Sequence, residues 1–129
     1  MKRVLIIGQN AVERALIAAQ LQEETPCAVE SAATIRDALA RLVIRPALVI
    51  LDWSALAEDA QTGFRAAARG APLLLLASRD DGESLERAGV DLRCVIFRPF
   101  TVGDVVVRAR ELLEGGIWNW LNRLLRPSK

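Results

Sequence analysis

An apolar run at residues 47–51, Ala-Leu-Val-Ile-Leu, ends abruptly at the carboxylate of Asp52. An unbroken aliphatic stretch of this length, preceded by Pro46, is typical of a strand buried on both faces. Both faces of a strand are buried when helices pack on each side of a mostly parallel sheet. Ligands and chemistry collect at the carboxyl ends of such strands, so Asp52 is the best single candidate for chemistry in the chain.

Four further apolar runs alternate with helical patterns along the chain. They predict strands at residues 3–7, 27–30, 73–76 and 92–97. Helices are predicted at residues 11–23, 35–42, 64–68, 85–88 and 101–113. This (βα)5 alternation predicts the α/β class, with parallel strands, right-handed crossovers and helices on both faces of the sheet. The pattern by itself does not fix the order of the strands.

Capping residues and apolar spacing support three of these helices. Asn10 is a candidate cap for the first, whereas Thr34 with Asp37 and Thr101 with Asp104 resemble capping boxes. The residues expected on buried helix faces are Val12, Ala15, Leu16 and Ala19, then Ile35, Ala38, Leu39 and Leu42, and finally Val105, Ala109 and Leu112.

The composition of the 129 residues excludes several classes of protein. Hydrophobic residues make up 52% of the chain, which argues against disorder. Lys plus Arg number 17 and Asp plus Glu 16, so the net charge of +1 gives no field that favours nucleic acid. The absence of His excludes His-based catalysis and the usual zinc sites. No apolar run reaches the roughly 18 residues that span a bilayer.

Two cysteines, Cys27 and Cys94, fall in predicted strands. Those strands are expected to lie about four places apart, roughly 19 Å, which is too far for a disulfide. We therefore expect two buried thiols in a reducing compartment, and a cytoplasmic protein.

Two stretches resemble parts of response-regulator receiver domains, the CheY-like domains of two-component signalling. Residues 45–53 resemble their phosphoacceptor strand, and residues 88–100 resemble their last helix–strand unit, which ends in Lys-Pro-Phe where this chain has Arg-Pro-Phe. With the helix at 101–113, the resemblance covers residues 1–114. It implies a flavodoxin-like three-layer sandwich with a five-stranded sheet in the order 2-1-3-4-5, and a site where the first and third strands diverge.

The resemblance also implies a site chemistry, of which this chain keeps only part. Asp52 takes the place of the phosphoacceptor. Gly8 and Gln9 stand where the family has two acids that help to hold Mg²⁺, a cation that prefers oxygen ligands. Because both carboxylates are missing, we assign no metal-binding residues, and we expect Mg²⁺ only if the site is active in phosphoryl transfer. Four acids in nearby loops could still fold in: Glu58, Asp59, Asp80 and Asp81.

The remaining family positions are altered as well. Ala77 replaces the hydroxyl residue, and the neighbouring Ser78 points the other way on an extended segment. Val95 replaces the aromatic residue. Arg98 replaces the Lys, keeping its charge but not its shape. We expect an ion pair between Arg98 and Asp52. The alternatives without a functional role are an Arg98 exposed at the surface and an Asp52 that only caps the next loop.

Three hypotheses for function follow. The first is a degenerate receiver in two-component phosphorelay signalling, not an enzyme, which acts by protein–protein contact with little or no Mg²⁺-dependent phosphorylation. The second is a functional phosphoacceptor, phosphorylated on Asp52 by a histidine kinase. The third is a small nucleotide-binding α/β domain with Gly8 at the phosphates and Glu30 on the ribose, although the further glycines of that motif are absent. The expected partner is a histidine kinase or an output protein.

Residues 115–129 form a separate C-terminal tail after Gly115-Gly116, predicted to be a short amphipathic helix. Its candidate partner-binding residues are Trp118, Trp120, Leu121 and Leu124. The tail could pack on its own domain, pair with a second copy in a homodimer or with another protein, or touch a membrane surface. A protein partner is favoured over a membrane.

Overall fold

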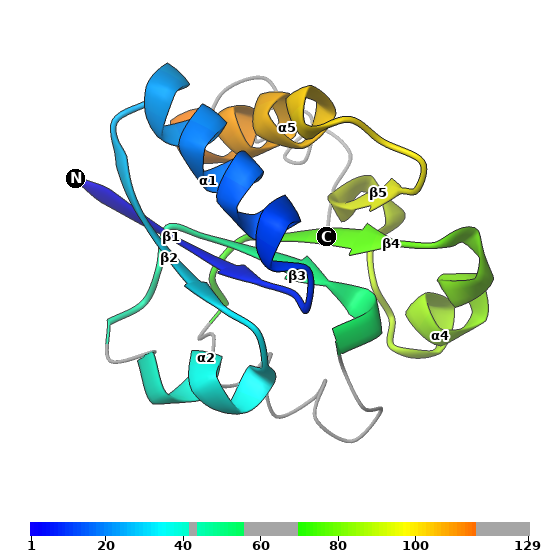
Figure 1. The fold of residues 1–129 in the computed structure, drawn as a ribbon. Helices are drawn as coiled ribbons and strands as arrows, with labels where there is room; N and C mark the ends of the chain where they lie inside the picture. Colours follow the sequence, from blue (N-terminus) through cyan, green and yellow to red (C-terminus); the bar gives the residue numbers. More distant parts are fainter. Residues whose placement is uncertain (42–43, 56–69, 116–129) are drawn as a thin grey trace, which may run out of the picture.

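The computed structural model describes residues 1–41, 44–55 and 70–115. Its five strands form one parallel sheet in the order β2-β1-β3-β4-β5 (Figure 1). The strands are β1 (Lys2–Ile7), β2 (Cys27–Ala32), β3 (Leu48–Asp52), β4 (Leu73–Ala77) and β5 (Val95–Phe97). The predicted α/β class and the strand order implied by the resemblance are both confirmed.

Helices cover both faces of this sheet. The helices in the described ranges are α1 (Ala11–Glu24), α2 (Ile35–Arg41), α4 (Gly82–Arg87) and α5 (Val102–Glu114). Short 3-10 turns span Trp53–Ala55, Arg79–Asp81 and Leu92–Cys94. Figure 1 shows α1 and α5 together on one side of the sheet and α2 on the other. The helix predicted at 64–68, and Leu42, lie outside the described residues.

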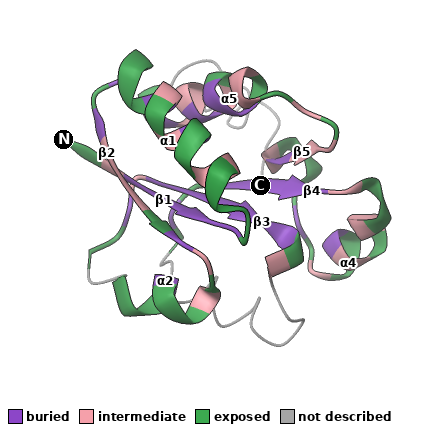
Figure 2. Ribbon diagram, in the orientation of Figure 1, coloured by how far each residue is buried: buried purple, intermediate pink, exposed green. Residues whose placement is uncertain are grey.

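The alternation of side chains along β3 creates two core layers. Val49 and Leu51 pack in the layer beneath α2 and α4, whereas Leu48 and Ile50 pack in the layer beneath α1 and α5. All five residues of β3 are buried, and Figure 2 shows the same pattern along the centre of the sheet. The strand that we predicted to be buried on both faces is therefore confirmed.

The caps predicted at Asn10 and Thr101 are present, and at α2 the Thr34 hydroxyl accepts from the Asp37 backbone N–H at 3.2 Å, one of the two bonds of the capping box predicted there. The Asn10 side chain accepts a hydrogen bond from the Glu13 backbone N–H at 3.0 Å. Thr101 and Asp104 each accept a bond from the other's backbone N–H, which completes a capping box at the start of α5. Gly115 ends α5 in the left-handed region, with φ at 63°, a conformation that glycine adopts at low cost.

The buried face predicted for α1 is wrong. Val12 is 68% exposed and Leu16 is 53% exposed, and Ala15 and Ala19 are exposed as well. Ile17 and Leu21 are buried instead, against the sheet and α5. Two stripes of α1 satisfy the three- and four-residue spacing of a helix face, so the spacing could not choose between them. On α2, Ala38 is buried as predicted but Leu39 is exposed.

Smaller corrections concern the end of the chain. β5 is only three residues long, because Leu92–Cys94 forms a 3-10 turn in which the Asp91 side chain accepts from the Arg93 backbone N–H. Cys94 therefore lies half-buried in a turn and not in a strand, whereas Cys27 is buried in β2; neither forms a disulfide. On α5, Val105 and Ala109 are buried as predicted, and Leu113 is more deeply buried than Leu112.

Candidate functional site

The candidate site lies at the carboxyl ends of β1 and β3. Asp52 is the last residue of β3 and is 8% exposed. Gly8 follows β1 directly, and a Cβ atom added at Gly8 would lie 3.2 Å from the Asp52 Cβ. The backbone after β1 therefore passes close against Asp52, which leaves little room for a larger side chain at position 8.

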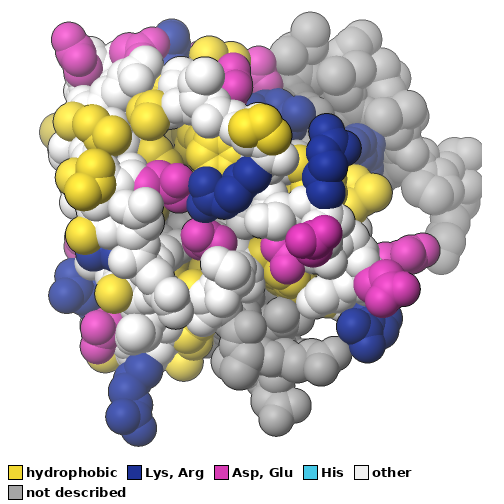
Figure 3. Space-filling view, turned by 45° about the vertical axis from the view of Figure 1, so that its right-hand side comes forward, with side chains coloured by type: hydrophobic (Ala, Val, Ile, Leu, Met, Phe, Trp, Pro, Cys, Tyr) yellow, Lys and Arg dark blue, Asp and Glu magenta, His cyan; other side chains and the backbone are white. Residues whose placement is uncertain are grey.

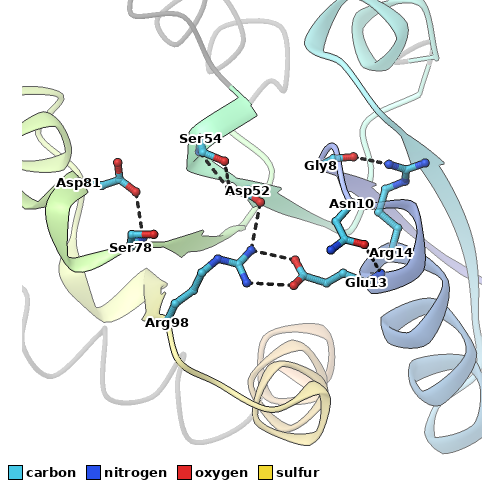
Figure 4. Close-up of polar contacts among 9 residues, drawn as sticks. All are labelled: Gly8, Asn10, Glu13, Arg14, Asp52, Ser54, Ser78, Asp81 and Arg98. Carbon is cyan, nitrogen blue, oxygen red and sulfur yellow. Dashed lines mark hydrogen bonds and ion pairs between the residues drawn. The ribbon is translucent and has the colours of Figure 1, made fainter.

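Both carboxylate oxygens of Asp52 accept hydrogen bonds, as Figure 4 shows. The Oδ1 atom accepts from the Ser54 backbone N–H at 3.1 Å and from the Ser54 hydroxyl at 2.8 Å. The Oδ2 atom accepts from the Arg98 Nη2 at 3.1 Å. Asp52 thus caps the turn that follows β3 and also forms the predicted ion pair with Arg98, so the two interpretations hold together.

Arg98 makes its stronger contact with a different carboxylate, that of Glu13. Its Nη1 donates to Glu13 Oε2 and its Nη2 donates to Glu13 Oε1, each at 2.9 Å (Figure 4). The guanidinium also lies 4.7 Å from the centroid of the Phe100 ring. Its hydrogen bonds with Glu13, followed by the charges of Glu13 and Asp52, raise the pKa of Arg98 above its ordinary value against the opposing effect of burial. Arg98 is therefore permanently charged and held between two carboxylates.

Glu13 supplies a second carboxylate at this site, which the sequence analysis did not identify. Glu13 lies in the first turn of α1, which begins just beyond the carboxyl end of β1. The sequence held a usable signal: an acidic residue three positions after the capping Asn10 must lie within the first helical turn, at the edge of the sheet where Asp52 lies. The resemblance places its acids directly after the strand, at Gly8 and Gln9, and therefore does not point to Glu13.

The other positions singled out from the sequence lie around this cluster. Ala77 is buried at the end of β4, and its carbonyl accepts from the Arg98 backbone N–H at 2.8 Å. Val95 is buried at the start of β5. Gln9 is exposed. Ser78 lies away from Asp52 in Figure 4, next to Asp81, and its backbone N–H donates to Asp81 Oδ2 at 2.9 Å.

The acids proposed to fold in from loops do not build a metal site in the part of the chain that is described. Asp81 is engaged in capping the turn at Ser78, and Asp80 is exposed. Glu58 and Asp59 lie outside the described residues. No group of three or more His, Cys, Asp or Glu side chains within residues 1–41, 44–55 and 70–115 could hold a metal ion.

The side chains present do not fit the Mg²⁺ that the resemblance implies. Asp52 and Glu13 could each supply an oxygen, but one nitrogen of Arg98 lies within 3.1 Å of both carboxylates. A guanidinium at that position offsets one of the two negative charges and repels a metal cation. The positive charge of Arg98 therefore stands where the resemblance would place a metal ion.

The structure also argues against the nucleotide-binding hypothesis. Glu30 would have to reach a ribose beside Gly8, but it pairs in register with Leu5, in the middle of β1. Its carboxylate forms an ion pair with Arg3, toward the start of that strand. The Glu30 side chain is thus directed away from the carboxyl edge.

Charges of both signs are interspersed on the face of the molecule shown in Figure 3, with hydrophobic side chains between them. No extended basic surface is visible on that face, as expected from the net charge of +1. The helices of the described ranges are all too short or too polar to cross a membrane. The tail residues Trp118, Trp120, Leu121 and Leu124 lie outside the described residues.

Comparisons with known proteins place this geometry in a familiar fold. No protein-family model and no curated protein matches the sequence. Among solved structures, the chain resembles a response regulator receiver modulated diguanylate cyclase from Pelobacter carbinolicus, with 25% identity, 95% of this chain and 99% of that chain covered, and a TM-score of 0.68.

Two further solved structures agree. A CheY-like response regulator receiver domain protein from Methanospirillum hungatei JF-1 is 21% identical over 88% of this chain and 94% of its own, with a TM-score of 0.70. A response regulator from Thermotoga maritima is 14% identical over 88% and 98%, with a TM-score of 0.66. The chain therefore has the receiver-domain fold of response regulators, as its sequence indicated.

Proposed function

We propose that this protein is a receiver-like signalling module of the two-component type that acts through protein–protein contact, with little or no Mg²⁺-dependent phosphorylation of Asp52. One observation carries the proposal: Arg98 lies between Asp52 and Glu13 and hydrogen-bonds to both. The crevice of the receiver fold thereby holds a positively charged side chain of the protein itself, which offsets part of the charge of the two carboxylates.

The chemistry of phosphoryl transfer supports this proposal. An attacking carboxylate must direct a lone pair at the phosphorus atom, and the transferred group needs cations and donors around it in the transition state. Both oxygens of Asp52 are engaged, by Ser54 and by Arg98. The chain offers neither a carboxylate at Gly8 or Gln9 nor a hydroxyl at Ala77, the positions at which the resemblance would place them.

Mass spectrometry of the full chain after incubation with acetyl phosphate and Mg²⁺ tests the proposal. We expect unmodified protein under conditions that phosphorylate a typical receiver domain run in parallel. A mass increase of one phosphoryl group that disappears in Asp52→Asn would overturn the degenerate interpretation and establish Asp52 as a phosphoacceptor.

A Mg²⁺ titration followed by the fluorescence of Trp53 provides a second test. Trp53 follows Asp52 directly, and its buried indole donates to the Ser84 hydroxyl at 3.0 Å, so its emission responds to changes at the end of β3. Trp118→Phe and Trp120→Phe remove the other two indoles from the signal. We expect no saturation at millimolar Mg²⁺, whereas tight saturable binding would contradict a site closed by Arg98.

The functional phosphoacceptor is the second candidate, and Glu13 is the observation that favours it. Glu13 and Asp52 contact the same guanidinium nitrogen, so two carboxylates converge on one point. If Arg98 moved to solvent, those carboxylates would face each other across a polar crevice. The acetyl phosphate experiment decides between the two candidates.

A further inference from the structure

The contacts of Arg98 are divided unequally between two carboxylates. Glu13 accepts from both Nη1 and Nη2, whereas Asp52 accepts only from Nη2. We propose that Glu13 is a positioning residue, which holds Arg98 beside Asp52 and couples the charge on Asp52 to the first turn of α1. This role would regulate the proposed signalling module, so its biological meaning rests on the proposed function. Its test needs neither a phosphodonor nor a partner.

The geometry explains why Glu13 is the residue that holds Arg98. The two parallel hydrogen bonds between a guanidinium and one carboxylate fix both the position and the plane of the guanidinium, which a single bond cannot do. The Arg98 Cζ also lies over the Phe100 ring, 4.7 Å from its centroid. Asp52 contributes one bond, and Ser54 already satisfies its other oxygen.

The Arg98 Nη2 atom is the hydrogen-bond donor that couples the two carboxylates. It is shared by Glu13 Oε1 at 2.9 Å and Asp52 Oδ2 at 3.1 Å. Any change that removes or adds negative charge at Asp52 therefore changes the electrostatic attraction on the guanidinium. If the guanidinium moves, the Glu13 side chain must move with it or lose a hydrogen bond. Contacts that share one partner are expected to be non-additive.

Glu13 transmits this change to an exposed surface. The Glu13 backbone N–H donates to the Asn10 side chain, so a movement of the Glu13 side chain is passed to the first turn of α1. The neighbouring Val12 and, one turn later, Leu16 are the large apolar side chains that α1 leaves in water.

The test is a set of ¹H–¹⁵N NMR spectra of the full chain. Asp52→Asn removes the charge at almost constant shape, and we expect it to shift the Arg98 Nε–H resonance and the amides of Val12 and Glu13. The double variant Glu13→Gln with Asp52→Asn should have the same Val12 amide chemical shift as the single variant Glu13→Gln. The matched control is Glu23→Gln, the same substitution on an exposed part of α1, in which the response to Asp52→Asn should be the same as in the unmodified chain.

Two outcomes would overturn the proposal. If Asp52→Asn shifts the Val12 amide resonance equally with and without Glu13, the change reaches α1 by way of Gly8, whose backbone passes close to Asp52. Glu13→Asp keeps the charge but is too short for both bonds, and it serves if Glu13→Gln does not fold. We expect Glu13→Asp to abolish the response at Val12; a retained response would show that charge alone, and not the paired contact, is required. Neither result depends on whether Asp52 is ever phosphorylated.

Discussion

Arg98→Met should destabilise the protein by about 2 kcal/mol, because it leaves two neighbouring carboxylates without their shared cation. The Arg98 side chain is 35% exposed, whereas those of Glu13 and Asp52 are 21% and 12% exposed. A charged hydrogen bond in such a partly buried setting is worth about 1.5–3 kcal/mol, against ~0.2–1 kcal/mol for an exposed ion pair. Met preserves much of the aliphatic length, so the lost charge dominates the effect.

Urea unfolding followed by far-UV circular dichroism measures this change, provided that the slope of the transition stays constant. The double variant Arg98→Met with Asp52→Asn should recover about 1 kcal/mol, since it removes the repulsion between the carboxylates. Arg93→Met is the matched control, because Arg93 pairs with Asp91 in an exposed ion pair and should matter much less. A loss below about 0.5 kcal/mol for Arg98→Met, within the range of ordinary surface substitutions, would refute the argument.

Three further predictions concern the crevice, the thiols and the tail. Gly8→Asp should destabilise the protein by about 1 kcal/mol in urea unfolding, because its Cβ would lie 3.2 Å from the Asp52 Cβ and its charge would face Asp52; an unchanged midpoint would mean that the backbone yields freely there. Cys27 should react with iodoacetamide more slowly than Cys94, because Cys27 is buried and burial raises the pKa of its thiol; mass mapping at several pH values checks this, and equal rates would contradict it. The full chain should be dimeric at micromolar concentration and a chain ending at Gly115 monomeric, because Trp118 and Trp120 are predicted to point roughly 200° apart and cannot both be covered by one flat surface; analytical ultracentrifugation showing a monomeric full chain would mean that the tail packs on its own domain.

The sequence by itself determined the α/β class of the protein and the strand at the centre of its sheet. The aliphatic run of β3 ending at Asp52 required a strand with helices on both faces, and that expectation is met by full burial of Leu48–Asp52. The caps at Asn10 and Thr101 fixed where α1 and α5 begin. These features depend on local hydrogen bonds and on the presence or absence of apolar side chains, both of which are written directly in the order of residues.

Only the tertiary structure decided which face of α1 is buried and that Glu13 joins Asp52 and Arg98 at the site. Val12 and Leu16 follow the same helical spacing as Ile17 and Leu21, and the choice between the two stripes is made by how α1 packs on the sheet and α5. Glu13 and Arg98 are 85 residues apart in the chain. Their contact, and the sharing of one guanidinium with Asp52, arises because parallel strands bring the ends of β1, β3 and β5 to the same edge, where distances in space no longer follow distances along the sequence.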